Sequence, residues 1–277
     1  GCAGGIDFTA TLPLSREAVP AGFTTLKVTL KGLKGGHSGA DIHLGLGNAS
    51  KLLARFLADN ADTLGLRLLD FTGGTLRNAI PREAIATLSI ATDKTDALKA
   101  AAEEFLATIQ FELSAVEKKI ALVVEATESN AKALTAETQG KFLALLNATP
   151  NGVIRMSDDV KGVVETSLNV GVVTMKDDEV AINSLIRSLI DSGKEYVVSM
   201  LNSLSALSGA KSLAKGSYPG WKPEPSSPVM TLVRETYETL FSKTPNIMVI
   251  HAGLECGLFK KPYPDMDMVS IGPTITG

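Results

Sequence analysis

The sequence predicts an α+β fold with a duplicated strand-helix-strand-strand-helix unit, followed by a partial α/β segment. Three observations predict it: strands with alternating apolar and polar residues, helices between them, and a second run of the same element order. The duplication rests on element order alone, because sequence identity between the two units is weak. A chain of 277 residues, 44% hydrophobic and 21% charged, is long enough for one large or two medium domains.

The first predicted unit opens with a strand of alternating, often β-branched residues that leads into the glycine-rich loop Gly35 to Gly39. Its elements are a strand over 23–32, a helix over 48–58, strands over 64–70 and 84–91, and a helix over 96–119. The second predicted unit has a strand over 120–125, a helix over 137–146, strands over 162–175 and 179–190, and a helix over 192–207.

The remaining chain has a different pattern. After Lys211, four of the twelve prolines fall in SYPGWKPEPSSP, which predicts an irregular crossing between domains. Beyond it we expect a helix over 229–241, a short buried strand over 247–250, a helix from Leu254 and a strand over 266–271. This alternation is typical of a parallel α/β sheet.

Composition argues against several classes of partner. The net charge of −3 gives no basic surplus, so we expect neither nucleic acid nor a membrane as a partner. Cys2 and Cys256 form no CxxC pair, and no signal peptide or apolar run of about 18 residues is present, so a cytoplasmic location is the simplest expectation. The chain opens without Met and closes on GPTITG, so we expect it to be cut from a longer protein.

His37 is the first candidate site residue, because it alone of the three histidines lies in a glycine-rich loop directly after a predicted strand. Such a loop lets the backbone approach a ligand, and an imidazole there can donate a hydrogen bond to a developing oxyanion. The alternative is a turn in which the histidine is merely solvated.

Asn78 and Arg187 are further candidates. Asn78 precedes Pro81 in RNAIP, where its amide could orient a polar substrate group, although a turn-forming asparagine is the plainer reading. Arg187 shares one face of a predicted strand with Asn183 and Leu185 and could bind a carboxylate with two hydrogen bonds. The alternative for Arg187 is an exposed surface arginine.

A metal site at His251 and Glu255 is not favoured. The two residues are four apart, as ligands on one helix face sometimes are, but Gly253 between them favours a loop that feeds a helix N-terminus. The sequence has no GxGxxG, P-loop, GxSxG or HExxH motif, so the residues alone do not specify a reaction.

Four segments, in order along the chain, resemble the aminoacyl-histidine dipeptidase family, also called Xaa-His dipeptidases, of the aminoacylase/carboxypeptidase group of two-zinc peptidases. They are KGLKGGHSG at 31–39, LRNAIPREA at 76–84, TSLNVG at 166–171 and IHAGLECGLF at 250–259. The resemblance implies a catalytic α/β domain interrupted by an α+β lid that closes over a dipeptide and can mediate homodimerisation. The implied organisation is the end of an N-terminal catalytic segment at 1–20, the lid at 21–208 and an incomplete C-terminal catalytic part at 209–277.

Residue by residue, the resemblance implies a role for each candidate. His37 would help to stabilise the tetrahedral oxyanion, Asn78 would contact substrate, Arg187 would hold the C-terminal carboxylate, and Gly253 would offer a backbone contact. A doubled lid would complete this site within one chain.

One departure from the family is decisive. The family's metal ligands, which would bind two divalent ions such as zinc, are expected before Gly1 and just past Gly277 and are not in this sequence. We therefore expect the isolated chain to bind no metal and to be inactive, although the whole protein would be a metallodipeptidase. Two alternatives stay open: a non-catalytic binding or oligomerisation protein derived from the lid, and an enzyme with one metal held by His251, Glu255 and other carboxylates.

Overall fold

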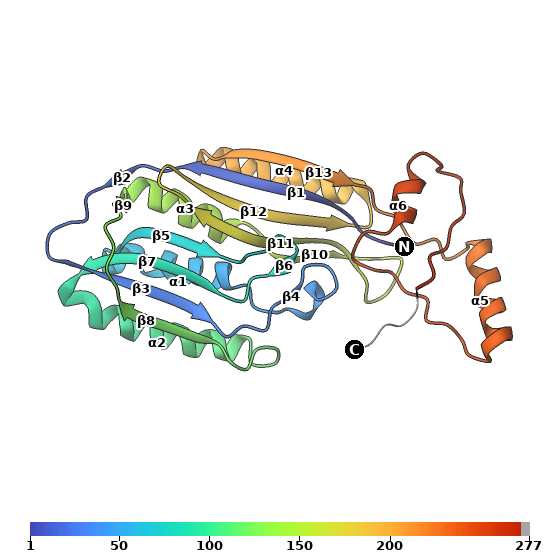
Figure 1. Cartoon of the computed structure of the whole chain (residues 1–277), viewed down its shortest axis with the longest axis horizontal. Coiled ribbons are helices and arrows are strands. Elements are labelled where there is room, and N and C mark those ends of the chain that lie inside the picture. The colour runs from blue at the N-terminus through green and yellow to red at the C-terminus, as the bar shows by residue number, and fades with distance from the viewer. Residues whose placement is uncertain (273–277) are drawn as a thin grey trace.

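The computed structural model describes residues 1–272 and is dominated by one antiparallel sheet (Figure 1). Its strands are β1 (Gly4–Pro13), β3 (Phe23–Lys31), β5 (Arg67–Gly73), β7 (Ala84–Ala91), β8 (Ala121–Ala126), β10 (Gly152–Met156), β11 (Val164–Met175), β12 (Glu179–Ser188) and β13 (Lys211–Tyr218). The strands are hydrogen-bonded in the order β13-β1-β12-β11-β5-β7-β3-β8, and β10 pairs with β11.

Four helices cover one face of the sheet: α1 (Ala49–Leu64), α2 (Thr95–Glu112), α3 (Ala136–Ala148) and α4 (Asp191–Ser208). The core lies between the two layers, because alternate strand residues face the helices. In β3, Leu26 and Val28 are buried, whereas Lys27 between them forms an ion pair with Glu125 of β8 on the other face, with Nζ 2.7 Å from the carboxylate.

Two short strand pairs fix the loops around the sheet. β2 (Arg16–Glu17) pairs with β9 (Ala133–Leu134), and β4 (Gly36–His37) pairs with β6 (Ala79–Ile80). Short 3-10 turns, η1 (Ile42–Leu44) and η2 (Thr92–Lys94), precede α1 and α2. The pairing of β4 with β6 sets the glycine-rich loop beside the segment that carries Asn78.

The sheet consists of two halves with corresponding strand orders. The first half is β8-β3-β7-β5 with α1 and α2, and the second half is β13-β1-β12-β11 with α3 and α4. They meet where β5 pairs with β11 through two residue pairs only, and the ammonium of Lys51 on α1 donates to the carbonyls of Leu146 (2.6 Å) and Asn147 (2.7 Å) on α3. The whole first half lies in the connection between β1 and α3.

The structure corrects several predicted elements. The strand expected to open the second unit at 120–125 is β8, which pairs with β3 and so closes the first half. The strand that opens the second half is β1, which was not predicted. The predicted irregular crossing after Lys211 begins as β13, because β1 supplies a hydrogen-bonding partner. β1 and β13 thus extend the sheet beyond the range 21–208 that was predicted for the lid. The helix predicted to reach residue 119 ends at Glu112.

As far as residue 272, the C-terminal region contains α5 (Pro228–Phe241) and α6 (Glu255–Lys260) but not the predicted parallel sheet. No strand forms over 247–250 or 266–271, and Ile250 makes only an isolated parallel bridge to Cys2. Ile247 and Met248 are 55% and 76% exposed, contrary to the prediction of a buried strand. A buried parallel strand needs strands on both sides, and residues 1–272 supply only that single bridge.

None of the helices in the described part of the chain combines the length and the apolar character that crossing a membrane requires.

Candidate functional site

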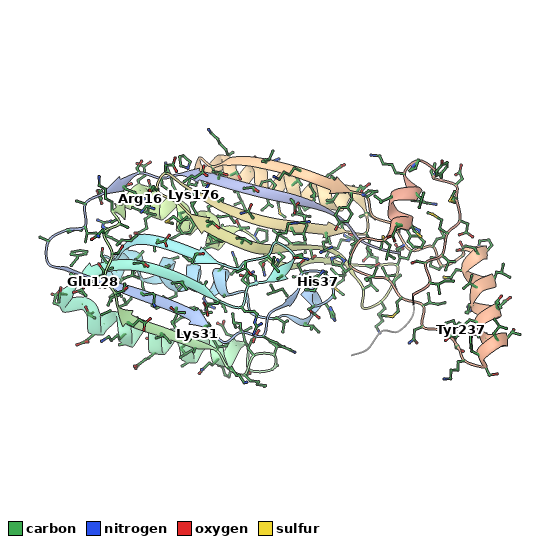
Figure 2. The ribbon with its side chains drawn as sticks, in the orientation of Figure 1. Arg16, Lys31, His37, Glu128, Lys176 and Tyr237 are labelled. Carbon is green, nitrogen blue, oxygen red and sulfur yellow. The ribbon has the colours of Figure 1, made fainter. Side chains whose placement is uncertain are left out.

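Polar side chains from both halves of the sheet meet around Arg187, near the end of β12. Figure 2 shows His37 at this end of the sheet, on the side of the C-terminal segment with α5 and α6. We call this group of residues the Arg187 site: Arg187, His37, Ser38, Asn78, Tyr218, His251 and Gly253.

Arg187 is buried, with 5% of its surface exposed. Its Nη1 donates to the Tyr218 hydroxyl (3.1 Å), and Nε and Nη2 both lie 3.4 Å from the Ser38 hydroxyl oxygen. No salt bridge within residues 1–272 includes Arg187. Burial lowers the pKa of its guanidinium from the ordinary value, and the Tyr218 contact opposes that shift. A buried cation held by hydroxyl groups alone is suited to receive an anion from outside.

His37 has a fixed tautomer. Its Nδ1 accepts hydrogen bonds from the backbone N–H groups of Gly39 (3.1 Å) and Ala40 (3.0 Å), so the proton of the neutral ring is on Nε2. Burial, followed by the charge of Arg187, lowers the pKa of His37, although Asp41 opposes the shift. At neutral pH the ring is therefore a neutral Nε2–H donor.

Asn78 lies in an exposed loop whose backbone is held from both sides. Its carbonyl accepts the N–H of Ser38 (2.9 Å), next to His37. From β11, the buried amide of Asn169 donates to the carbonyls of Arg77 (3.2 Å) and Ala79 (2.9 Å). The amide of Asn78 is thus presented to solvent from a fixed backbone.

The loop around Asn78 joins the two halves. Arg77 forms an ion pair with Asp7 of β1, with Nη1 2.7 Å from Oδ1. Gly74 approaches β11 so closely that a Cβ there would lie 1.9 Å from the carbonyl oxygen of Gly171, and Gly74 also has φ +69. This loop belongs to the first half but is fixed on the second.

The segment containing His251 and Gly253 closes the site. His251 is 8% exposed, and its Nε2 lies 2.8 Å from the Ser167 hydroxyl. Burial, followed by the charge of Arg187, lowers the pKa of His251 to about 4, so the ring is neutral at pH 7. A Cβ on Gly39 would lie 2.0 Å from the His251 carbonyl oxygen, and a Cβ on Gly253 would lie 3.0 Å from the Tyr218 ring.

The side chains of residues 1–272 do not form a ligand set for a pair of metal ions. His251 and Glu255 do not share a helix, because α6 begins at Glu255, and His251 Nε2 is paired with Ser167. No group of three His, Cys, Asp or Glu side chains in the described part of the chain is arranged to hold a metal ion. The chemistry that these residues can perform is binding and orientation of an anionic, polar ligand.

The structure brings together the four predicted positions His37, Asn78, Arg187 and Gly253 and adds residues that the sequence did not single out. Ser38 and Asn169 fall inside the segments that carried the family resemblance, which is a signal that could have found them. Tyr218 lies in the proline-rich stretch assigned to a domain crossing, and only its pairing with β1 identifies it.

The comparisons with known proteins agree with the resemblance. A family model described as a peptidase dimerisation domain matches residues 28–117. The chain is 68% identical over its 277 residues to the cytosol non-specific dipeptidase of Escherichia coli (strain K12), covering all of this chain and 57% of that protein. The crystal structure of an aminoacylhistidine dipeptidase from Vibrio alginolyticus matches with a TM-score of 0.96 and 54% identity, over 100% of this chain and 56% of that one. The chain thus spans a little over half of the length of these relatives.

Proposed function

Because this chain resembles the aminoacyl-histidine dipeptidases over its whole length, we propose that it forms the lid and part of the catalytic domain of a dipeptidase that hydrolyses dipeptides such as Xaa-His. The observation that carries the proposal is the Arg187 site, where a buried guanidinium without a carboxylate partner among residues 1–272 adjoins the loop of a neutral histidine. A dipeptide offers the two matching groups, a terminal carboxylate and a carbonyl that becomes an oxyanion during hydrolysis.

Each residue has a defined part in this proposal. Arg187 binds the C-terminal carboxylate, for which a planar guanidinium offers parallel donors. The Nε2–H of His37 donates to the oxygen of the scissile carbonyl as negative charge develops on it. The amide of Asn78 contacts the peptide backbone, and Gly253 lets the chain approach the substrate closely.

In this proposal the complete enzyme binds two divalent metal ions, which we propose to be zinc. The side chains of residues 1–272 do not provide a set of ligands for them. We therefore propose that the ligands come from the rest of the complete protein, and that the chain as given binds no metal pair and does not turn over substrate.

We also infer that the two halves of the sheet are copies of one unit. Their strand orders correspond, and the dimerisation-domain match at 28–117 falls in the first half. In this arrangement the first half supplies His37 and Asn78 and the second half supplies Arg187, so that one chain completes the site. A homodimer formed through the lid and a cytoplasmic location are further parts of the proposal, the latter because the E. coli relative is named for the cytosol. The lid of this proposal comprises 21–208 together with β1 and β13.

The experiment compares metal content and hydrolysis of β-Ala-His for the 277-residue chain and for the product of the complete reading frame that contains it. Activity with about two metals per chain in the longer protein alone supports the proposal. Activity in the 277-residue chain contradicts the assignment of the ligands to the rest of the protein. Inactivity of the longer, metal-loaded protein on all dipeptides contradicts the function itself.

Completion of the site within one chain is tested by mixing two full-length variants, one lacking His37 and the other lacking a metal ligand. If each chain builds its own site, the mixture stays inactive. Restored activity means that His37 acts on a neighbouring subunit and contradicts the inference.

A further inference from the structure

Tyr218, Gly5 and Arg187 lie in one row across three neighbouring strands. Gly5 of β1 is opposite Arg187 of β12 on one side and opposite Tyr218 of β13 on the other. Side chains at directly opposed positions lie on the same face of a sheet, so Arg187 and Tyr218 share a face and Gly5 separates them.

Because Gly5 has no side chain, the ring of Tyr218 can lie over β1. A Cβ on Gly5 would lie 2.5 Å from the Tyr218 hydroxyl oxygen and 2.6 Å from Cζ, closer than atoms can approach. The ring therefore crosses over β1 and brings its hydroxyl to 3.1 Å from Nη1 of Arg187. On another side, Gly253 lies against the same ring, with its Cβ position 3.0 Å from Cε2.

The direction of this hydrogen bond leaves a donor free. A guanidinium has no lone pair to offer, so Arg187 donates and the Tyr218 oxygen accepts. Within residues 1–272 the hydroxyl makes no other hydrogen bond, and its own proton is without an acceptor. The Tyr218 hydroxyl oxygen thus accepts a hydrogen bond from Nη1 of Arg187, and its O–H remains available as a donor beside the guanidinium.

We propose that Tyr218 is a positioning and specificity residue that holds Arg187 and donates a hydrogen bond from its hydroxyl group to the C-terminal carboxylate of the substrate. The inference deepens the proposed function and rests on the role given there to Arg187. It assigns recognition of a free C-terminus to two residues on β12 and β13, the strands on either side of β1, with Gly5 of β1 between them.

The test is the Tyr218→Phe variant of the full-length, metal-loaded protein, assayed on a dipeptide and on the same dipeptide with a C-terminal amide. The variant keeps the ring and loses only the hydroxyl. We expect KM for the free dipeptide to rise about tenfold, with kcat changed less than about twofold, because a hydrogen bond to a charged group is lost. The preference for the free acid over the amide falls by the same factor.

Two further variants separate this role from a general effect on the fold. Tyr196→Phe, at an exposed position on α4, leaves KM and the acid-to-amide preference unchanged. Gly5→Ala keeps the tyrosine but displaces its ring, and it raises KM in the same way while thermal denaturation monitors the fold.

The outcomes distinguish this inference from the function on which it rests. A wild-type protein without dipeptidase activity overturns both. An active wild-type protein whose Tyr218→Phe variant keeps the original KM and acid-to-amide preference overturns the role of Tyr218 alone.

Discussion

Arg187 Nε lies 3.4 Å from the hydroxyl oxygen of Ser38, although 149 positions separate the two residues in the sequence. Arg187 belongs to the second half of the sheet, and Ser38 follows His37 in the first. The contact therefore couples the carboxylate-binding cation of the proposed function to the loop that carries the oxyanion donor.

Replacing Arg187 by lysine removes the planar donor set but keeps a positive charge. In the full-length protein we expect KM for dipeptides to rise about tenfold to a hundredfold, because a single ammonium cannot make the paired contacts. Steady-state kinetics measures the change, with Arg155→Lys at an exposed position as the control. Equal KM values for Arg187→Lys and wild type would remove Arg187 from carboxylate recognition.

Replacing Asn169 by alanine removes the two hydrogen bonds to the carbonyls of Arg77 and Ala79. We expect the free energy of unfolding to fall by about 1–3 kcal/mol, because polar groups of the loop lose their buried partner. Amide hydrogen exchange around residues 77–79 should also become faster than in wild type. Asn60→Ala serves as a comparison, because the amide of Asn60 donates to the carbonyl of Phe56 within α1, and its loss should leave exchange in this loop unchanged. Unaltered exchange in Asn169→Ala argues against its role in holding Asn78.

Replacing Gly39 by alanine places a Cβ 2.0 Å from the His251 carbonyl oxygen and 3.2 Å from Nε of Arg187. We expect a loss of about 1–3 kcal/mol in the free energy of unfolding, because backbone must move to admit the methyl group. Gly140→Ala is the matched control: Gly140 lies inside α3 with no atom within 4 Å of its Cβ position, and alanine there should stabilise the protein by about 0.5–1 kcal/mol. Urea unfolding measures the free energy of unfolding of both variants. If Gly39→Ala is as stable as Gly140→Ala, the packing described at Gly39 is wrong.

The stability of the protein should depend on pH through His251. The pKa of the folded-state ring is about 4, below its ordinary value of 6.5, so the unfolded chain binds the proton more tightly. The contribution of the neutral His251 to the free energy of unfolding, up to roughly 3 kcal/mol, is fully present above pH 6.5. It is lost as pH falls from about 6.5 to about 4. Urea unfolding across this range, compared with His251→Gln, isolates the contribution. If the two proteins lose stability in parallel, His251 is not its source.

The sequence predicted much of the sheet and all four of its covering helices, because alternation and helical spacing are local signals. The alternation in β3 and the apolar spacing in α1 are examples. The prediction was wrong where pairing decides the structure. β13 is exposed along most of its length and is a strand because β1 lies beside it, whereas the apolar run at 247–250 has no adjacent strands among residues 1–272 and stays irregular.

The candidate site was less accessible to local reasoning. For Arg187, Asn78 and His37 in isolation, a solvated or turn-forming role was the favoured reading, and the family resemblance alone joined the three residues in one site. Asn169 and Tyr218 contact other parts of the site across distances in sequence of 90 and 31 positions. Contacts of that kind depend on strand register, which no short segment of sequence encodes.

The insertion of the first half between β1 and α3 also limits how many sites a chain can contain. Two separate copies of one unit would be equivalent, and each would need every functional side chain. Here the connection that carries His37 in the first half is occupied, in the second, by the entire first half. In the proposed duplication a single asymmetric site results, and each copy is free to lose the residues that the other retains. We therefore expect substitutions to be poorly tolerated at different places in the two halves: in the β3–α1 loop of the first half and at the end of β12 in the second half.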